Sequence, residues 1–279
     1  MKKTARQAAA LASCLLLSAF VCCRGGDAPP KQASERELAR TVIERVRRNF
    51  DYRDFKFRLN ITRTFPNGAR YAKTFQFYGT LGDAGSRVFA ESVSDPTVES
   101  TCYLLVFSDQ KLVSAKMSSP SMGEAETREG EDDLNKITFG NLSYPEFRHM
   151  VSLRPEDVDA VTEEDGFFVL RSHVAEQPAR EAGDEAPRGL EASRASRFIY
   201  HIDRESYLPV RIEFFNRREK FKEFSLEAKE EIKGRWVVRR GKVKDFIDQS
   251  ETLLEFEDVR LDEGVDESVF TERRLRARD

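Results

Sequence analysis

The chain has 279 residues, of which 39% are hydrophobic and 34% charged, and it contains 21 phenylalanines. This composition excludes a disordered chain and indicates a globular protein rich in residues that favour strands. The formal net charge is −3, and residues 1–22 hold three basic residues and no acid, so the remaining chain carries about −6. A mildly acidic chain without a basic block is not expected to bind nucleic acid.

The N-terminus has the features of a signal peptide over residues 1–23. Lys2, Lys3 and Arg6 precede an uncharged, mostly apolar stretch from Ala8 to Cys23. This stretch is shorter than the roughly 20 apolar residues of a membrane-spanning helix, which favours an export signal over a permanent anchor. We therefore expect an exported protein that resides in the periplasm.

Three of the four cysteines lie in or at the end of this apolar stretch, at positions 14, 22 and 23. A cysteine that ends an apolar export signal is the position at which bacterial lipoproteins are cleaved and acylated. We therefore predict lipidation at Cys22 or Cys23, with membrane association through this N-terminal anchor, and plain cleavage is the alternative. The folded part retains only Cys102, which excludes an internal disulfide.

A tether and an amphipathic helix are predicted to follow the signal peptide. Residues 24–33 are polar and include two prolines, which is typical of a tether. Ser34-Glu-Arg-Glu37 forms a capping box, so we expect a helix from Ser34 to about Phe50. Its apolar stripe must lie on another part of the protein and consists of Leu38, Val42, Ile43, Val46 and Phe50. Residues 34–279 are predicted to form a single domain.

Alternation of apolar and polar residues predicts strands in the first half of this domain. The alternation is clearest from Phe55 to Ile61, and Pro66-Asn-Gly68 is a strong turn signal. Tyr103–Phe107 is apolar at consecutive positions, so we expect both of its faces to be covered. The strands expected here are Phe55–Thr62, Tyr71–Leu81, Val88–Val93, Tyr103–Phe107 and Lys111–Met117.

The middle of the chain contains two polar segments that read as insertions. Residues 118–136 are polar and acidic, which predicts a long exposed loop, and residues 176–196 hold almost no large apolar residue. Between them, Ser143–Met150 is expected to be a short helix with Pro145 in its first turn. Residues 157–162 and 167–174 are expected to pair as a hairpin.

The C-terminal part predicts a meander of antiparallel strands, because short alternating runs follow one another with polar turns between them. These runs are Arg197–Asp203, Tyr207–Phe215, Lys220–Ala228, Trp236–Val238 and Glu251–Val259. The fold class is therefore α+β, with about 10–11 antiparallel strands in one sheet that must curl.

Catalytic and metal-binding motifs are absent from the sequence. There is no G-x-S-x-G, H-E-x-x-H, C-x-x-C or P-loop pattern. His149, His173 and His201 stand apart from other metal-ligand residues at suitable spacing. The acidic residues at 129–133 could attract a cation, but a solvated loop is the simpler interpretation. We therefore expect neither enzymatic activity nor a cofactor or metal.

Several C-terminal motifs carry a resemblance to a known family. Tyr200-x-Ile202-Asp203 is followed by Leu208-Pro209, Gly234 and Trp236 lie in one hairpin, and Val269-Phe-Thr271 precedes Leu275. This pattern resembles the LolA-like family of outer-membrane lipoprotein-sorting proteins. Lys136–Tyr144 is similar to a further motif of that family, with Asn141 where an aspartate is usual.

The resemblance implies an open antiparallel half β-barrel with helices that cover its mouth. It implies a cell-envelope carrier or acceptor that binds the acyl chains of lipoproteins or lipids and needs no cofactor. It also suggests a lipid-exporting membrane permease as a further partner. The alternative is an envelope-stress sensor or adaptor module that binds a protein partner without catalysis.

Apolar residues of the predicted strands are expected to share one concave inner face. Leaving them in contact with water would cost about 2 kcal/mol per side chain, so some other part of the protein or a ligand must cover them. Two interpretations remain open: an ordinary core under the helices, or a partly covered cavity that holds an acyl chain. The residues expected on this face are Phe55, Phe57, Leu59, Ile61, Phe75, Phe77, Val210, Ile212, Phe214, Phe224, Leu226, Trp236, Val238, Leu254 and Phe256, and all of them except Leu254 are proposed to bind the ligand.

Overall fold

The computed structural model describes residues 30–82, 85–93, 101–108, 111–118, 126–128, 138–143, 146–147, 150, 153–173 and 195–276. The predicted signal peptide, the lipidation sites Cys22 and Cys23, His149 and nearly all of the predicted insertion at 176–196 lie outside these residues. The described helices are α1 (Pro30–Arg48), α4 (Glu272–Arg276) and the 3-10 helices η1 (Pro155–Asp157) and η3 (Glu267–Phe270).

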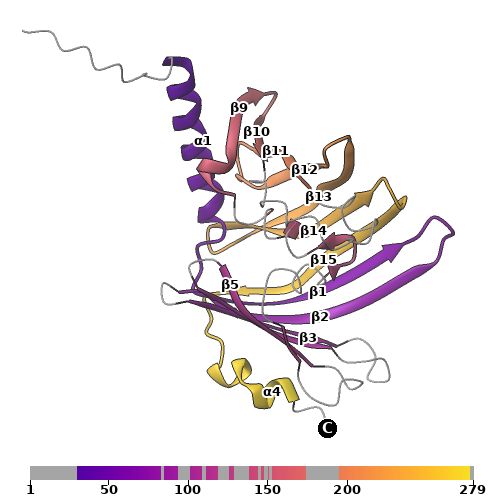
Figure 1. Cartoon of the computed structure of the whole chain (residues 1–279). Coiled ribbons are helices and arrows are strands. Elements are labelled where there is room, and N and C mark those ends of the chain that lie inside the picture. The colour runs from indigo at the N-terminus through magenta and orange to yellow at the C-terminus, as the bar shows by residue number, and fades with distance from the viewer. Residues whose placement is uncertain are drawn as a thin grey trace, which may run out of the picture.

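The strands run through most of the remaining described chain (Figure 1). The first eight are β1 (Asp54–Thr64), β2 (Arg70–Thr80), β3 (Ser86–Ser92), β4 (Cys102–Ser108), β5 (Lys111–Ser118), β6 (Glu126–Arg128), β7 (Thr138–Phe139) and β8 (Leu142–Ser143). The others are β9 (Val158–Glu164), β10 (Phe167–His173), β11 (Arg197–Asp203), β12 (Pro209–Phe215), β13 (Lys220–Ile232), β14 (Arg235–Asp245) and β15 (Ser250–Leu261).

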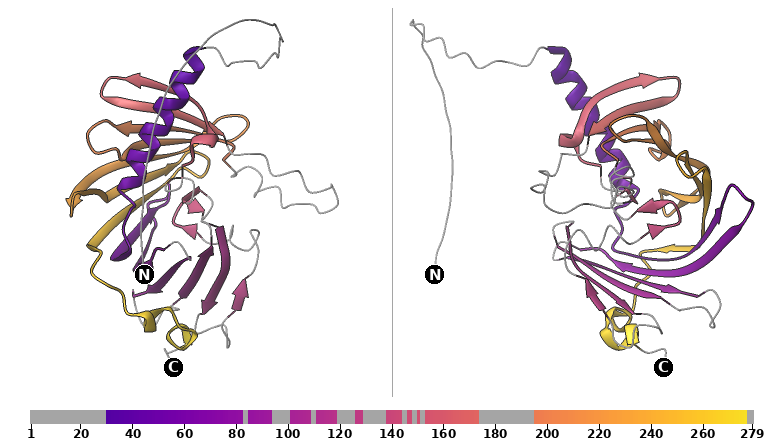
Figure 2. Two further views of the ribbon diagram at one scale, coloured as in Figure 1. Left: turned by 90° about the vertical axis from the view of Figure 1, so that its left-hand side faces the viewer. Right: turned by 45° about the vertical axis from the view of Figure 1, so that its right-hand side comes forward.

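Thirteen of the described strands form one antiparallel sheet in the order β6-β5-β4-β3-β2-β1-β15-β14-β13-β12-β11-β10-β9. The sheet consists of two meanders, β1–β6 and β9–β15, which join where the first strand pairs with the last. It curves into an open half-barrel whose end strands are β6 and β9, and the small β7–β8 hairpin lies on its concave side (Figure 2).

This architecture confirms the predicted α+β fold with an open, curved antiparallel sheet. The thirteen strands exceed the expected number in part because β6 forms inside the segment 118–136, for which the polar composition predicts a loop. β6 pairs with Ala115–Met117 at the end of the sheet. A short polar strand suits this position because an edge strand has a neighbour on one side only.

Helix α1 covers the β9 end of the sheet with its apolar stripe. Ala39, Val42, Ile43 and Val46 are buried in the main core, and α1 contacts β9 and η1. The helix begins at Pro30 and not at the predicted cap Ser34, so residues 30–33 are helical and not part of a tether. Proline is compatible with this start because the first helical turn needs no intrahelical N–H donor.

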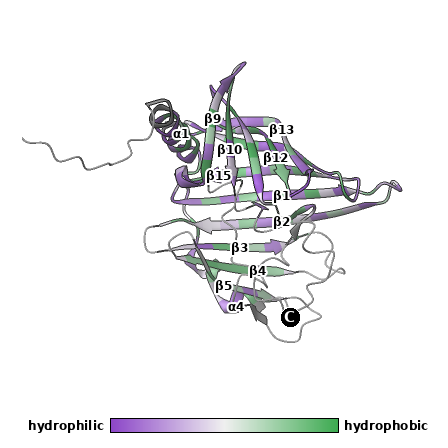
Figure 3. Ribbon diagram, turned by 45° about the horizontal axis from the view of Figure 1, so that its top comes forward, coloured by the Kyte–Doolittle hydropathy of each residue, from purple (hydrophilic) through white to green (hydrophobic). Residues whose placement is uncertain are grey.

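Both faces of β4 are covered, as its continuous apolar sequence predicts. Leu105 belongs to the main core on the concave side. Cys102 and Leu104 instead pack with Phe270 of η3 and Leu275 of α4. The C-terminal helices therefore cover the outer face of β2–β5, and β4 is hydrophobic along most of its length in Figure 3.

The connection between the two meanders, residues 138–157, contributes to the core on the concave side. Leu142 and Leu153 are buried, and Phe147 and Met150 are partly buried against the same cluster. Glu146, Phe147 and Met150 are helical, while Leu142 and Ser143 form strand β8. The predicted helix Ser143–Met150 is therefore present in part, and its first residue belongs to a strand.

Candidate functional site

A row of aromatic rings crosses the concave face of the sheet. The ring centroids of Phe57 on β1 and Phe77 on β2 are 4.9 Å apart in a stacked arrangement, and that of Phe256 on β15 is 5.5 Å from Phe57. The row is contiguous because the register places Phe57 opposite Phe77 and Leu59 opposite Phe256. It continues through Phe55, Tyr52, Phe75 and Tyr103, with neighbouring centroids 5.4 to 6.4 Å apart.

Two glycines make room for rings on this face. A Cβ at Gly79 would lie 2.1 Å from the Phe55 ring, and a Cβ at Gly241 would lie 2.5 Å from the Phe224 ring. Gly79 is the register partner of Phe55. Each ring therefore lies directly over the backbone of the neighbouring strand, which only glycine permits at this distance.

Nine of the fifteen proposed inner-face residues are buried in the main core, and their shared environment agrees with the predicted strand phase. They are Phe55, Leu59, Ile61, Phe75, Phe77, Ile212, Phe214, Phe224 and Leu254. Four more pack against the same cluster and remain half-buried, namely Phe57, Leu226, Val238 and Phe256. The half-buried residues come from β1 and from the adjacent strands β13, β14 and β15.

Val210 and Trp236 do not join either hydrophobic cluster. Between β11 and β12 the register shifts so that His201 pairs with Arg211 and Ile202 with Pro209, which leaves Val210 as the bulged residue. A bulge breaks the period of two, so Val210 does not share the face of Ile212. Trp236 is half-buried, and Lys229 Nζ lies 4.8 Å from its ring centroid.

A second bulge shapes the row of rings at Phe57. The pairing of β1 with β15 shifts between Lys56 and Arg58, and Asp258 on the opposite strand has a φ of 50°. Bulges bend a strand and redirect a side chain. Here the extra residue lies on β15, where Asp258 and Val259 together face Phe57. Phe57 stands between Phe77 and Phe256 and keeps part of its surface exposed.

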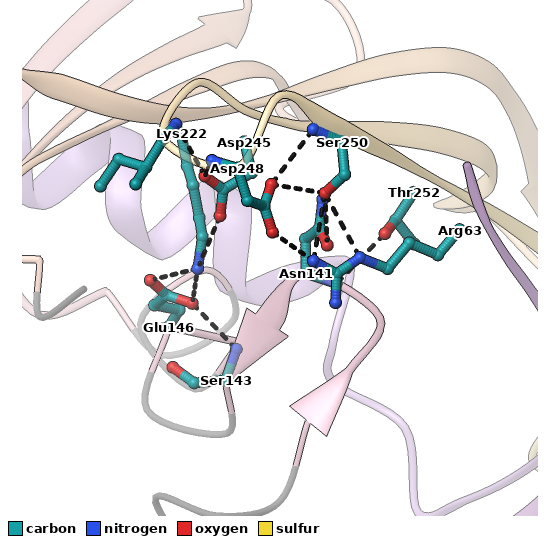
Figure 4. Close-up of polar contacts among 10 residues, drawn as sticks. Arg63, Asn141, Ser143, Glu146, Lys222, Asp245, Asp248, Ser250 and Thr252 are labelled. Carbon is teal, nitrogen blue, oxygen red and sulfur yellow. Dashed lines mark hydrogen bonds and ion pairs between the residues drawn. The ribbon is translucent and has the colours of Figure 1, made fainter. Parts of the chain in front are cut away.

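A buried ion pair holds the connection between the meanders against the sheet (Figure 4). Lys222 Nζ on β13 lies 3.0 Å and 2.9 Å from the two carboxylate oxygens of Glu146. Glu146 also accepts a hydrogen bond of 2.8 Å from the Ser143 backbone N–H, and Lys222 lies 3.7 Å from Asp245. Every charge in this group therefore has a partner of opposite sign, as buried charges require.

The turn between β7 and β8 binds β15 through polar groups beside this ion pair. Asn141 Nδ2 donates to Ser250 Oγ over 2.9 Å, and the Asn141 backbone N–H donates to Thr252 Oγ1 over 3.1 Å. Gly140 in the same turn has a φ of 65°, and a Cβ there would lie 2.5 Å from Thr252 Cγ2. The motif Gly140-Asn141 thus fixes the hairpin on the inner face.

A third polar group lies near the C-terminal end of α1. Asn49 Nδ2 donates to the Ser206 carbonyl over 2.8 Å, and the Trp236 backbone N–H donates to Asn49 Oδ1 over 3.0 Å. Lys229 Nζ donates to Asp203 Oδ2 over 2.7 Å. Burial alone would raise the pKa of Asp203, but the hydrogen bonds from Lys229 and Ser206 outweigh it and lower this pKa to about 2.

Sequence reasoning missed Lys222 and Glu146. The only local signal is that Lys222 has the same strand phase as Phe224 and Leu226, so a charge falls on an otherwise apolar face. Its partner lies 76 residues away along the chain, and no local pattern links the two.

The described residues offer no metal centre and no membrane span. No group of three or more His, Cys, Asp or Glu side chains among them could hold a metal ion. His173 pairs with Asp159, and burial together with the nearby Arg211 lowers the pKa of His201. Within the described part of the chain, no helix is long and apolar enough to cross a membrane.

Comparisons with known proteins show the fold. A model of a family described only as an uncharacterized protein matches residues 170–277, and no functionally curated protein matches the sequence. A DUF1329 family protein from Desulfovibrio piger superposes with a TM-score of 0.70 at 15% identity, over 86% of this chain and 99% of that one.

Two further solved structures are similar to this chain. An outer membrane lipoprotein-sorting protein domain from Vibrio parahaemolyticus has a TM-score of 0.65 at 12% identity, over 87% of this chain and 98% of that one. A LolA superfamily protein from Nitrosomonas europaea has a TM-score of 0.57 at 15% identity, over 84% and 97%. The predicted LolA-like fold is therefore confirmed.

Proposed function

We propose that this protein is a cell-envelope carrier or acceptor that binds the acyl chains of lipoproteins or lipids on the concave face of its half-barrel. The observation that carries the proposal is the row of aromatic rings in which Phe57 and Phe256 keep exposed surface. An acyl chain has no polar groups to satisfy, so an apolar, aromatic-lined face suits it. The similarity of the fold to a lipoprotein-sorting protein domain and to a LolA superfamily protein supports the same class of ligand.

The binding energy for such a ligand would come from apolar burial. Each methylene group removed from water contributes about 0.8 kcal/mol, so a chain laid along Phe57, Leu226, Val238 and Phe256 needs no charged contact. Transfer to another carrier then depends on relative affinity, which requires neither a cofactor nor catalysis. The segment that carries Leu142 and Phe147 packs on the same core and is the part that a longer ligand would displace.

The location of the protein forms part of the proposal. The export signal over residues 1–23 leads to the periplasm, and acylation at Cys22 or Cys23 anchors the chain to a membrane. Its partners are then an acylated lipoprotein or a lipid, together with a lipid-exporting permease that supplies the ligand.

The test is purification from the native membrane fraction followed by mass spectrometry of the organic extract, with uptake of a fluorescent fatty acid measured in parallel. A co-purified acyl lipid and saturable uptake are expected. Phe57→Ala should weaken uptake at least about tenfold, because truncation of a phenylalanine side chain removes about 1.5–3 kcal/mol of apolar contact.

Phe215→Ala is the matched control. Phe215 is also half-buried, but it packs under Arg197, with 4.4 Å between the guanidinium carbon and the ring centroid, and it neighbours the inward-facing Phe214. It should retain uptake. An empty extract together with no uptake by the parent protein would contradict the carrier proposal and favour an adaptor that binds a protein partner.

A further inference from the structure

Exposed hydrophobic side chains lie at one end of the sheet, which we call the turn rim. It consists of the β1–β2, β12–β13 and β14–β15 turns together with strand residues that flank them, over residues 64–70, 216–220 and 244–249, all on the right-hand side of Figure 1. Phe246 and Ile247 at the tip of the third turn are 45% and 52% exposed, and Tyr71 beside the first turn is 50% exposed. Solvent exposure of adjacent aromatic and aliphatic side chains at a turn tip is unfavourable, so these residues suggest a contact surface.

Side-chain contacts join the three turns into one surface. Lys220 Nζ of the second turn lies 5.3 Å from the centroid of the Phe246 ring, and the Phe246 backbone N–H donates to the Phe221 carbonyl over 2.8 Å. Asp248 of the third turn pairs with Arg63, which precedes the first turn and lies over the Phe65 ring at 4.7 Å. The exposed hydrophobic side chains therefore belong to turns that are held in place by contacts with one another.

The turn rim is basic although the chain as a whole is not. Its three segments hold five basic and three acidic residues, whereas the whole chain has 46 basic and 49 acidic residues. Two of the three acids are engaged internally, because Asp245 Oδ1 accepts the Ile247 backbone N–H over 3.0 Å and Asp248 pairs with Arg63. One of the five basic residues, Lys220, is also engaged, because it pairs with Glu213 and Glu223. Arg217, Arg218 and Lys244 are exposed.

We propose that the turn rim docks on an anionic phospholipid membrane. Phe246 and Ile247 enter the boundary between headgroups and acyl chains, while Arg217, Arg218 and Lys244 contact the lipid phosphates. A membrane surface is favoured as the partner because it offers an apolar layer directly beneath an anionic one, which matches an apolar tip flanked by cations. The inference rests on the proposed function, since a carrier of acyl chains must reach a bilayer to load or release them.

The test is co-sedimentation with vesicles, using the exported full chain with Cys22→Ser and Cys23→Ser so that no acyl anchor masks the contribution of the rim. The parent should bind vesicles of phosphatidylcholine that contain phosphatidylglycerol, and bind pure phosphatidylcholine much more weakly. Arg217→Gln with Arg218→Gln should weaken binding roughly thirtyfold, because each basic side chain at an anionic surface contributes about a factor of five. Phe246→Ser with Ile247→Ser should reduce binding further.

Val113→Ser is the matched control, because Val113 is 53% exposed but lies on β5, near the end of the sheet opposite to the turn rim. It should bind vesicles like the parent. Failure of the parent to bind, equal binding to both kinds of vesicle, or rim variants that bind like the parent would each overturn the proposal. Uptake of the soluble fatty acid should survive in the rim variants, because the rim is separate from the aromatic row. A parent protein that takes up no fatty acid but binds anionic vesicles would speak against the carrier function and not against the docking surface.

Discussion

Lys222 of β13 and Glu146 of the connection between the two meanders form an ion pair in which the two side chains are only 7% and 5% exposed. The pair joins segments that are 76 residues apart in the chain on the concave side of the sheet. The connection is therefore fixed to the concave side of the sheet at this point by a charge interaction as well as by the burial of Leu142 and Leu153.

Glu146→Ala is expected to lower the free energy of unfolding by about 3–5 kcal/mol, because it leaves the Lys222 ammonium buried with only Asp245 nearby. Urea denaturation measures the change. Lys222→Met combined with Glu146→Leu should recover most of the loss, since neither charge then remains buried. Glu163→Ala, which breaks the exposed pair with Arg204, is the control and should cost at most about 1 kcal/mol. A similar small cost for Glu146→Ala would show that water reaches the pair.

Gly140→Ala tests how the β7–β8 hairpin is attached to β15. Alanine at this position would have to adopt a positive φ, at about 1–2 kcal/mol, and would also collide with Thr252, which adds about 1–3 kcal/mol. Gly166→Ala is the control because its φ of 82° imposes the same backbone strain while nothing lies within 4 Å of the added Cβ. Thermal unfolding should show a larger loss of stability for Gly140→Ala than for Gly166→Ala. Equal losses would show that Thr252 moves aside without cost.

Asp203 makes the stability of the α1 end dependent on pH. Its pKa in the folded protein is about 2, against an ordinary value of 3.8. The stabilisation of the folded state by the Asp203 carboxylate is therefore complete above the ordinary pKa. It is lost as the pH falls through the folded-state pKa. At neutral pH this contribution amounts to about 2 kcal/mol. Asp203→Asn should therefore be less stable than the parent at about pH 6, and the gap should narrow on approach to about pH 2. A gap that does not vary with pH would exclude the carboxylate as its source.

The strands were predictable wherever one face of a strand is buried and turns flank it. Arg197–Asp203 is strand β11 with the predicted bounds, and the hairpin predicted from 157–162 and 167–174 is β9–β10. Alternation specifies such strands locally, because a one-residue slip would move every apolar side chain to the wrong face. The assignment of Ile212, Phe214 and Phe224 to one face follows from the same rule and agrees with their burial in one cluster.

The features that the sequence could not predict depend on partners distant in the chain. The bulge at Val210 arises from the pairing of β11 with β12, and nothing in the local alternation marks it. The start of α1 at Pro30 lies outside the apolar stripe, so periodicity gives no signal there. The bulge of β15 opposite Phe57 likewise arises from the pairing of β1 with β15, which the pattern of either strand alone does not contain.

Ile212 and Phe57 separate the packed core from the surface proposed to bind acyl chains. Ile212 is fully buried, so Ile212→Glu places an unpaired carboxylate among apolar side chains and should cost several kcal/mol, enough to unfold much of the population. Phe57 keeps part of its surface exposed, so the carboxylate of Phe57→Glu can reach water and the protein should remain folded while uptake of a fluorescent fatty acid is lost. Arg211→Glu, at an exposed position adjacent to Ile212, is the control and should change neither property. Circular dichroism melts and probe titrations measure the two effects separately. A folded Ile212→Glu protein would show that the inner face is less tightly packed at β12 than the structure indicates, and unchanged uptake by Phe57→Glu would place the acyl chain away from the aromatic row.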